Sequence, residues 1–316
     1  MKAVAINEFG GREKLELMDL PRPHAGSNEL LVGVRAAGVN PVDWKIREGW
    51  FKDVFDHRFP VILGWDAAGV IVEAGGEVTG FREGDEVFAY CRKREVAEGA
   101  YGEYITLSAD AVAHKPESMS FEEASSVPLA ALTAYQALFD AATLFAGETV
   151  FIHAASGGVG TFAVQLAKNH GAYVLGTASS ANHDYLRKLG VDRPIDYRTE
   201  DPCKVVCEEQ NCRVDVVFDC LGNGTLLKSQ AFTTAESRNV SIVDTDAVKT
   251  LQDEGKKADF VFVKPDGAQL QEIRGMIDTG WLSTHLAAVY SLEEAAKAHE
   301  HIEAGHTRGK IVLTPS

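Results

Sequence analysis

The fold of this chain can be inferred from one stretch, TVFIHAASGGVGTFAVQLAK, residues 149–168. It begins with an apolar run, continues through three glycines in four positions, and ends in a segment with apolar residues at helical spacing, Thr161–Lys168. A strand, a glycine turn and a helix in this order can hold a pyrophosphate, because the glycines allow close approach and the helix start offers unpaired N–H groups. We assign this contact to Ser156, Gly157, Gly158, Val159 and Gly160.

The turn departs from the usual dinucleotide spacing, G-x-G-x-x-G. Ser156 stands at the first glycine position, Gly158 at the second, and Gly160 closes the motif early. An ordinary tight strand–helix turn is therefore the alternative. The surroundings favour a dinucleotide, since apolar runs and helical segments alternate from Glu148 onward, as in a doubly wound parallel sheet. The predicted strands cover residues 149–155, 173–177, 194–197, 214–219, 239–243 and 260–263.

The end of the second predicted strand indicates the type of dinucleotide. A site for NAD usually carries Asp or Glu about 20 residues beyond the glycine turn, where it binds the ribose 2′-hydroxyl. The segment Leu175–Ser180 holds hydroxyls and no acid. Hydroxyls can donate to a 2′-phosphate, so we predict NADPH as the cofactor, with Thr177, Ser179 and Ser180 in its site. The alternative is that the two serines only cap the following helix.

The two ends of the chain have a different pattern. Short runs rich in Val, Ile and Leu, such as Glu29–Val34 and Ala67–Val72, are broken by Gly and Pro and predict a barrel-like β domain. The pattern changes near Ser120, and the last stretch, 287–313, reads as strand, helix and strand returning to the first domain. We predict an α/β protein with a β-barrel domain over 1–122 and 286–316 and a Rossmann domain over 123–285.

Composition argues against two classes of partner. The 316 residues include 31 basic and 46 acidic side chains, a formal charge of −15, which disfavours nucleic acids and anionic membranes. We see no signal peptide and no membrane span, and therefore expect a cytoplasmic protein. An odd number of cysteines, five, suggests reduced thiols. The spacing of Cys203, Cys207 and Cys212 is irregular, and we predict no metal site.

Six motifs run through nearly the whole chain. They are AAGVNPVDWKIREG (36–49), PVILGWDAAGVIVEAGGEVTGFREGDEVFAY (60–90), AALTAYQAL (130–138), AASGGVG (154–160), IDYRTED (195–201) and RGKIVL (308–313). With these motifs the chain resembles the medium-chain dehydrogenase/reductase superfamily, and more narrowly its zinc-free quinone oxidoreductase (zeta-crystallin-like) branch. The resemblance implies a GroES-like β domain with an inserted Rossmann domain, and a homodimer that pairs through the strand near 260–263.

The resemblance also bears on metal use. Zinc-dependent relatives carry Cys at the position of Asn40 and a His-Glu pair at Trp65-Asp66, and these ligands are absent here. Without zinc as a Lewis acid, an acceptor that spreads its charge is favoured. We therefore expect a zinc-independent reductase of small quinones or α,β-unsaturated carbonyls. An enoyl-thioester reductase and a non-catalytic nucleotide-binding protein are the alternatives.

The matching positions suggest further site residues. Asn40 and Thr133 are the expected catalytic residues. Their alternatives are a turn residue before Pro41 and a hydroxyl bonded to its own helix. The cofactor-binding residues implied by the resemblance are Tyr197, Arg198, Leu221, Gly222, Val243, Phe262 and Lys310.

Some positions depart from the family or leave two interpretations open. Relatives carry a Lys near Ala181, so its absence weakens strict use of NADPH. Lys310 is either a cofactor contact or part of an exposed basic turn. The aromatic residues Trp44, Trp50, Phe51 and Trp65 either line a substrate pocket or form ordinary packing. No proton donor follows the Asn40 loop, so solvent would supply the proton, and Asp43 would fix the loop by hydrogen bonds. The histidines His299, His301 and His306 are expected to be solvated.

Overall fold

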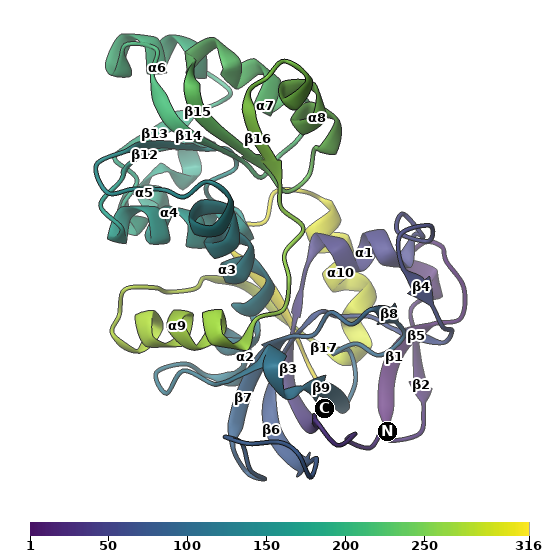
Figure 1. Cartoon of the computed structure of the whole chain (residues 1–316). Coiled ribbons are helices and arrows are strands. Elements are labelled where there is room, and N and C mark those ends of the chain that lie inside the picture. Colours follow the sequence, from purple (N-terminus) through teal and green to yellow (C-terminus); the bar gives the residue numbers. More distant parts are fainter. Residues whose placement is uncertain (316) are drawn as a thin grey trace. The chain divides into compact units, whose positions relative to one another are not determined.

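The computed structural model describes residues 1–315, which form two compact units (Figure 1). Unit 1 contains Met1–Leu132 and the chain from Lys264 onward, and unit 2 contains Thr133–Val263. The sequence placed these changes at 122/123 and 285/286. Two helices account for the difference: α2 (Phe121–Ser125) packs on β3 and β6, and α9 (Gly267–Asp278) packs on β10, all strands of unit 1.

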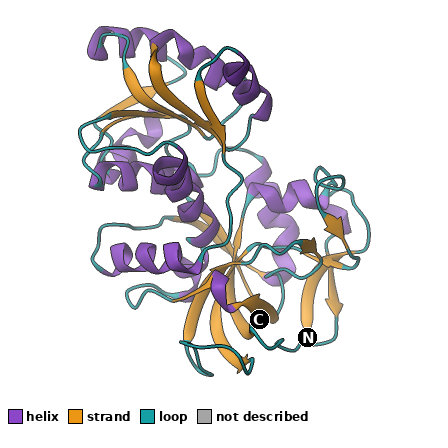
Figure 2. Cartoon of the chain, in the orientation of Figure 1, coloured by secondary structure: helices purple, strands orange, loops and turns teal. Residues whose placement is uncertain are grey.

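Unit 2 is built on one parallel sheet with the strand order β13-β12-β11-β14-β15-β16. The strand order reverses between the neighbouring strands β11 and β14, which is the doubly wound arrangement, and the predicted Rossmann fold is confirmed. Helices connect the strands (Figure 2). The strands are β11 (Thr149–Ile152), β12 (Tyr173–Ala178), β13 (Arg193–Asp196), β14 (Val214–Asp219), β15 (Thr233–Ser241) and β16 (Lys257–Phe260); the helices are α4 (Gly158–Asn169), α5 (His183–Leu189), α6 (Pro202–Gln210), α7 (Thr225–Lys228) and α8 (Thr245–Asp253).

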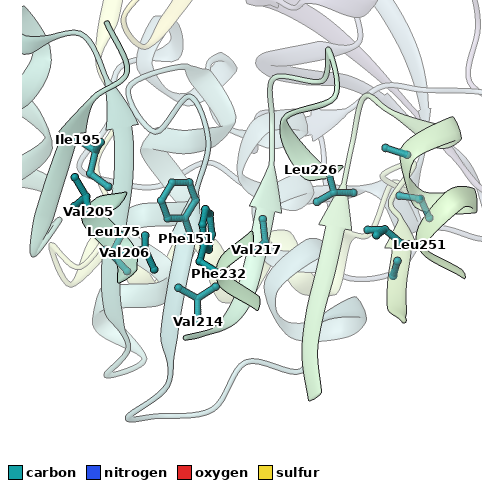
Figure 3. Close-up of a cluster of buried hydrophobic side chains, with 13 residues drawn as sticks. Phe151, Leu175, Ile195, Val205, Val206, Val214, Val217, Leu226, Phe232 and Leu251 are labelled. Atoms are coloured by element: carbon teal, nitrogen blue, oxygen red, sulfur yellow. The ribbon is translucent and has the colours of Figure 1, made fainter. Parts of the chain in front are cut away.

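One face of this sheet carries the hydrophobic core drawn in Figure 3. Strand residues such as Phe151 and Leu175 are fully buried against Val206 of α6, Leu226 of α7 and Leu251 of α8. Burying one such side chain contributes roughly 1.5–3 kcal/mol. The core fixes the strands of this sheet, and with them the loops at their carboxyl ends.

The strand predicted over 260–263 is wrong by three residues. Strand β16 ends at Phe260, whose partner Ser241 is the last residue of β15. The apolar run that continues to Val263 therefore has no neighbouring strand to pair with. Phe262 lies in the irregular segment that follows β16, and it is half-buried.

Unit 1 is built on a sheet with the order β10-β7-β6-β3-β18-β17, and β9 also pairs with β3. The predicted return of the C-terminus is confirmed, since β18 pairs antiparallel with β3. A smaller sheet has the order β2-β1-β5. The strands are β1 (Lys2–Ile6), β2 (Glu16–Asp19), β3 (Glu29–Val39), β4 (Asp56–His57), β5 (Val61–Ile62), β6 (Asp66–Ala74), β7 (Glu86–Tyr90), β8 (Glu95–Val96), β9 (Tyr104–Ser108), β10 (Val112–His114), β17 (Leu286–Ser291) and β18 (Lys310–Thr314).

Three more helices complete the description. Helix α1 (Pro41–Arg47) directly follows β3 and packs on α10 (Ala295–Glu303). Helix α3 (Pro128–Tyr135) continues into a π-helical turn, Gln136–Ala141. Among residues 1–315, none of the helices has the length and apolar character that crossing a membrane requires.

The expectation of reduced thiols is wrong for two cysteines. Cys207 and Cys212 form a disulfide. The chain turns back at the end of α6, because Asn211 and Cys212 both have left-handed backbone angles, with φ of 53° and 56°. This turn brings Cys212 beside Cys207, whereas Cys203 remains a free thiol.

We predict that Gly160→Ala destabilises unit 2. A Cβ at Gly160 would lie 2.5 Å from the Ala154 carbonyl oxygen and 2.7 Å from the Ala155 backbone. Because backbone must move, the change should cost about 1–3 kcal/mol, measured as a lower thermal midpoint. Gly275→Ala in α9 is the control, since its new Cβ has no atom within 4 Å, and it should stabilise by about 0.5–1 kcal/mol. An unchanged midpoint for Gly160→Ala would contradict the close approach.

Candidate functional site

The glycine turn joins β11 to α4 in a form that suits a phosphate. The N–H groups in the first turn of an α-helix have no partner within the helix. Here the N-cap residue is Gly157, which provides no side-chain cap. Gly160 is needed for a different reason, since its lack of a Cβ lets α4 approach the backbone of Ala154 and Ala155. The uncapped N–H donors and the open turn fit the pyrophosphate of a dinucleotide.

Two of the predicted hydroxyls lie beside this turn. Asn182 bridges them, because its Nδ2 is 3.4 Å from the Oγ of Ser156 and 3.4 Å from the Oγ of Ser179. The Thr177 hydroxyl accepts a hydrogen bond of 3.1 Å from the Ala154 N–H, so it supports the turn. The sequence analysis missed Asn182, although its place three residues after Ser179 was a signal.

A buried carboxylate organises the adjacent strand ends. Asp196 accepts hydrogen bonds from the backbone N–H of Arg198 at 3.0 Å and of Ser180 at 3.1 Å. The bond from Arg198, followed by that from Ser180, holds the pKa of Asp196 below its usual value against the opposing effect of burial. Tyr197 is half exposed, and the Arg198 guanidinium lies 5.6 Å from the centre of its ring. Asp196 therefore holds Ser180 and Arg198 close together, and it was missed because these partners lie in the two separate loops that follow β12 and β13.

A second buried carboxylate ties the loops after β14 and β15. Oδ1 of Asp219 accepts from the N–H groups of Leu221 and Gly222, at 3.1 and 3.0 Å, and Oδ2 accepts from the Ser241 hydroxyl at 2.9 Å. The same Ser241 oxygen accepts from the Val243 N–H at 3.2 Å. The predicted residues Leu221, Gly222 and Val243 are thus held together. An acid at the end of a strand was the signal for Asp219.

In unit 1, Asn40 lies at the end of β3 and is 2% exposed. Its Nδ2 donates to Oδ2 of Asp66 at 2.8 Å, and its Oδ1 accepts a short hydrogen bond from the Lys310 ammonium. Lys310 can only donate and a carboxylate accepts, so the amide has one orientation. The second N–H of this amide has no partner within residues 1–315, and it can donate to a bound carbonyl.

Lys310 is 5% exposed, so the interpretation as an exposed basic turn is wrong. Its Nζ also lies 3.4 Å from Oδ2 of Asp66 and 3.4 Å from the Val39 carbonyl oxygen. Burial raises the pKa of the Asp66 carboxyl, and the Lys310 charge and the Asn40 amide oppose that shift. Contact of Lys310 with the cofactor remains a prediction, and the structure adds its role in holding Asn40.

The remaining predicted residues fall into different surroundings. Thr133 is buried in α3. Trp65 is buried, with its ring 6.1 Å from Tyr90 and 5.9 Å from Phe55. Trp50 is 62% exposed and meets Trp44 edge to face at 5.0 Å. Phe51 lies 6.0 Å from Phe55, the same ring that contacts Trp65. These contacts are aromatic packing, and a role in a substrate pocket remains a prediction.

The expectation that His299 is solvated is wrong, because its side chain is fully buried. Arg47 and Tyr101 provide partners for its two ring nitrogens, at 3.1 and 3.3 Å, and these contacts offset its removal from water. His301 is half-buried and bonds to Tyr290, whereas His306 is exposed. Asp43 fixes the Asn40 loop as predicted, accepting from the Asn40 N–H at 2.7 Å.

Comparison with known proteins identifies the family. The "Alcohol dehydrogenase GroES-like domain" model matches residues 26–117 and the "Zinc-binding dehydrogenase" model matches residues 189–313. The chain is 31% identical to the chloroplast envelope quinone oxidoreductase homolog of Arabidopsis thaliana, over 100% of this chain and 98% of that protein. It belongs to the quinone oxidoreductase branch of the medium-chain dehydrogenase/reductase superfamily.

Other quinone oxidoreductases agree. That of Mus musculus is 31% identical, over 99% of this chain and 97% of its own. The structure of the quinone oxidoreductase from Coxiella burnetii has a TM-score of 0.90 and 33% identity, over 99% of both chains. That of Escherichia coli, complexed with NADPH, has a TM-score of 0.88 and 27% identity, over 100% of both. The predicted family, fold and oxidoreductase activity are confirmed.

We predict that Lys310→Met strongly destabilises this quinone oxidoreductase homologue. It would leave the Asp66 carboxylate, which is 0% exposed, without its cation. Breaking a buried ion pair costs about 3–5 kcal/mol, measurable from urea unfolding. Adding Asp66→Asn should recover part of that loss. Lys297→Met, which breaks the exposed pair with Glu294, is the control and should cost less than about 1 kcal/mol. Additive effects of Lys310→Met and Asp66→Asn would contradict the coupling.

Proposed function

We propose that this oxidoreductase uses NADPH, without zinc, to reduce small quinones or α,β-unsaturated carbonyls. The observation that carries the cofactor choice is the set of groups at the carboxyl ends of β12 and β13. Hydroxyls of Ser179 and Ser180 and the guanidinium of Arg198 lie there, and both oxygens of Asp196 are engaged by backbone N–H groups. Donors and a positive charge favour a 2′-phosphate.

When bound to unit 2, a reduced nicotinamide would supply the hydride. The protein's task is then to bind the dinucleotide and to stabilise the charge that forms on the acceptor. The glycine turn would hold the pyrophosphate, and Leu221, Gly222 and Val243, tied by Asp219 and Ser241, would line the nicotinamide side. The Escherichia coli quinone oxidoreductase, whose structure is a complex with NADPH, supports this choice for the present chain.

Asn40 is the proposed donor to the acceptor oxygen. The Lys310 ammonium bonds to its Oδ1, which polarises the amide and strengthens the remaining N–H as a donor. One amide N–H stabilises a phenolate or enolate oxygen, whose charge is delocalised, better than it stabilises a localised alkoxide. Solvent provides the proton in this proposal. The zinc ligands of metal-dependent relatives have no counterpart at Asn40 and Trp65.

We also propose a cytoplasmic homodimer. Strand β16 lies at the edge of the sheet in unit 2, and its outer side has no strand partner among the described residues. Such an edge can pair with the same strand of a second copy. A monomer on size exclusion at working concentration would overturn this part of the proposal.

The function is tested by turnover in the presence of a metal chelator. NADPH or NADH is mixed with the protein and one acceptor: a benzoquinone, an ortho-quinone, a 2-alkenal, a cyclic enone or crotonyl thioester. Turnover is measured as the loss of absorbance of the reduced nicotinamide. We expect turnover with quinones or enones and NADPH that chelator leaves unchanged. Preference for the thioester would favour an enoyl-thioester reductase, and stoichiometric zinc would overturn the proposal.

Arg198→Gln tests the cofactor choice. We expect KM for NADPH to rise about tenfold, since one charge-assisted contact with the 2′-phosphate is lost. KM for NADH should stay the same, because NADH carries no phosphate there. The control is Arg187→Gln on α5, which removes a cation paired with Asp184 in the same unit. Equal effects on both dinucleotides would place Arg198 outside the 2′-phosphate site.

A further inference from the structure

A buried chain of hydrogen bonds connects α10 to the Asn40 loop. Arg47, His299, Tyr101 and Asp43 are each at most 1% exposed. The Arg47 NH1 group lies 3.1 Å from Nδ1 of His299, and Nε2 of the same ring lies 3.3 Å from the Tyr101 hydroxyl. The Tyr101 hydroxyl donates to Oδ2 of Asp43 at 3.1 Å. The chain ends where Asp43 accepts the Asn40 N–H at 2.7 Å.

The chemistry of the four groups gives this chain one direction. A guanidinium has no acceptor, so Nδ1 of His299 must accept from Arg47. The ring proton then resides on Nε2, which donates to the Tyr101 oxygen. The single hydroxyl proton of Tyr101 is left for Asp43. Arg47 therefore only donates, His299 and Tyr101 each accept one hydrogen bond and donate the next, and the Asp43 carboxylate accepts the last one.

The outer end of the chain is fixed. The Arg47 guanidinium donates to the Gly10 carbonyl at 3.1 Å, to Glu303 at 2.8 Å and to Glu48 at 2.6 Å. These bonds leave the guanidinium in one orientation. Burial, and then the Arg47 charge, lower the pKa of His299 to about 3, so the ring is neutral at physiological pH.

The inner end depends on two donors. Oδ2 of Asp43 accepts from Asn40 and Tyr101, while Oδ1 is buried and has no partner. Nothing else among the described residues bonds to this carboxylate, so its position depends on those two contacts. The Asn40 amide, in turn, needs its backbone held if its side chain is to meet Lys310 and Asp66.

We propose that Tyr101 and His299 are positioning residues for Asn40. Arg47 fixes the tautomer of His299, His299 orients the Tyr101 hydroxyl, and Tyr101 holds Asp43 against the Asn40 backbone. The proposal deepens the proposed function, because it rests on Asn40 as the donor to the acceptor oxygen.

The charge state of Asp43 gives a readout. Burial raises the pKa of Asp43 to about 7, against the stabilising bonds from Asn40 and Tyr101. Charged and titratable residues from four elements face this group. Asp66 on β6 opposes its ionisation, and Lys310 on β18 favours it. Tyr90 and Cys91, at the end of β7, interact with its charge, and neutral His299 on α10 acts through Tyr101. Removing the Tyr101 hydroxyl takes away a bond to the carboxylate form, so the Asp43 pKa must rise.

Nuclear magnetic resonance tests the chain without any assay of activity. In protein labelled with ¹⁵N, we expect His299 to be the neutral Nε2–H tautomer from about pH 5 to 9. The chemical shift of the Asn40 backbone amide should change near neutral pH, because this N–H donates to the Asp43 carboxylate and follows its ionisation. Tyr101→Phe should move that titration up by about one pH unit. A charged or Nδ1–H imidazole, or an unmoved titration, would overturn the proposal.

Activity is the second measurement. Activity that needs the Asp43 carboxylate falls as pH drops through the Asp43 pKa, so Tyr101→Phe should shift this acid limb of kcat/KM upward. His299→Gln keeps a donor toward Tyr101 and should preserve the limb, whereas His299→Leu should shift it. Tyr290→Phe, which removes the other Tyr–His bond of α10, is the control and should change nothing. Acid limbs that do not move in Tyr101→Phe and His299→Leu would show a merely structural role.

The two proposals fail in different ways. If the unmodified protein turns over no acceptor, the proposed function fails. The resonance measurements still decide whether the chain of hydrogen bonds holds the Asn40 backbone. If turnover is normal and the Asn40 titration ignores Tyr101, only the positioning role is lost. The tautomer of His299 is independent of both the acceptor and the dinucleotide.

Discussion

The placement of Asn40 in unit 1 depends on the hydrogen bonds and the ion pair of one buried carboxylate, that of Asp66. It accepts from the Leu129 N–H at 2.7 Å, from the Asn40 amide at 2.8 Å and from the Lys310 ammonium at 3.4 Å. Leu129, Asn40 and Lys310 come from α3, from the end of β3 and from the first residue of β18. One fully buried charge thus joins three segments that are distant in sequence. A carboxylate so deeply buried is tolerable only while these donors stay in place.

The same device recurs in unit 2. Asp219 holds two loops through its bonds with Leu221, Gly222 and Ser241. Asp196 likewise holds two loops, through the N–H groups of Ser180 and Arg198. Each acid lies at the carboxyl end of a strand, where loops meet in a doubly wound sheet. Rigid strands, packed through the core around Phe151, place the acids, and the acids place backbone N–H groups. The packing of the hydrophobic core therefore determines, through these two acids, where the polar loops lie.

Local patterns made much of this predictable. The turn Ser156–Gly160 and its strand and helix are contiguous, so sequence alone predicted them. The error at 260–263 arose because an apolar run resembles a strand whether or not a partner is present. His299 was misjudged because its partners Tyr101 and Arg47 are 198 and 252 residues away. Asn182 and Asp196 act by bridging groups in the loops that follow separate strands, which spacing along one segment cannot reveal.

In the proposed function, the arrangement around Asn40 would limit which acceptors can react. The charges of Lys310 and Asp66 are opposite and adjacent, so the pair brings no net positive charge to the site, unlike a divalent metal. What remains is a polarised amide N–H. A hydrogen bond of this kind cannot replace a metal ion beneath a localised alkoxide, but it suits an oxygen whose negative charge spreads over a ring or an enolate. Since such a donor gains its effect from fixed placement, precise control of the Asn40 backbone matters more here than added charge, and Asp43 provides that control through the backbone while Lys310 holds the side chain.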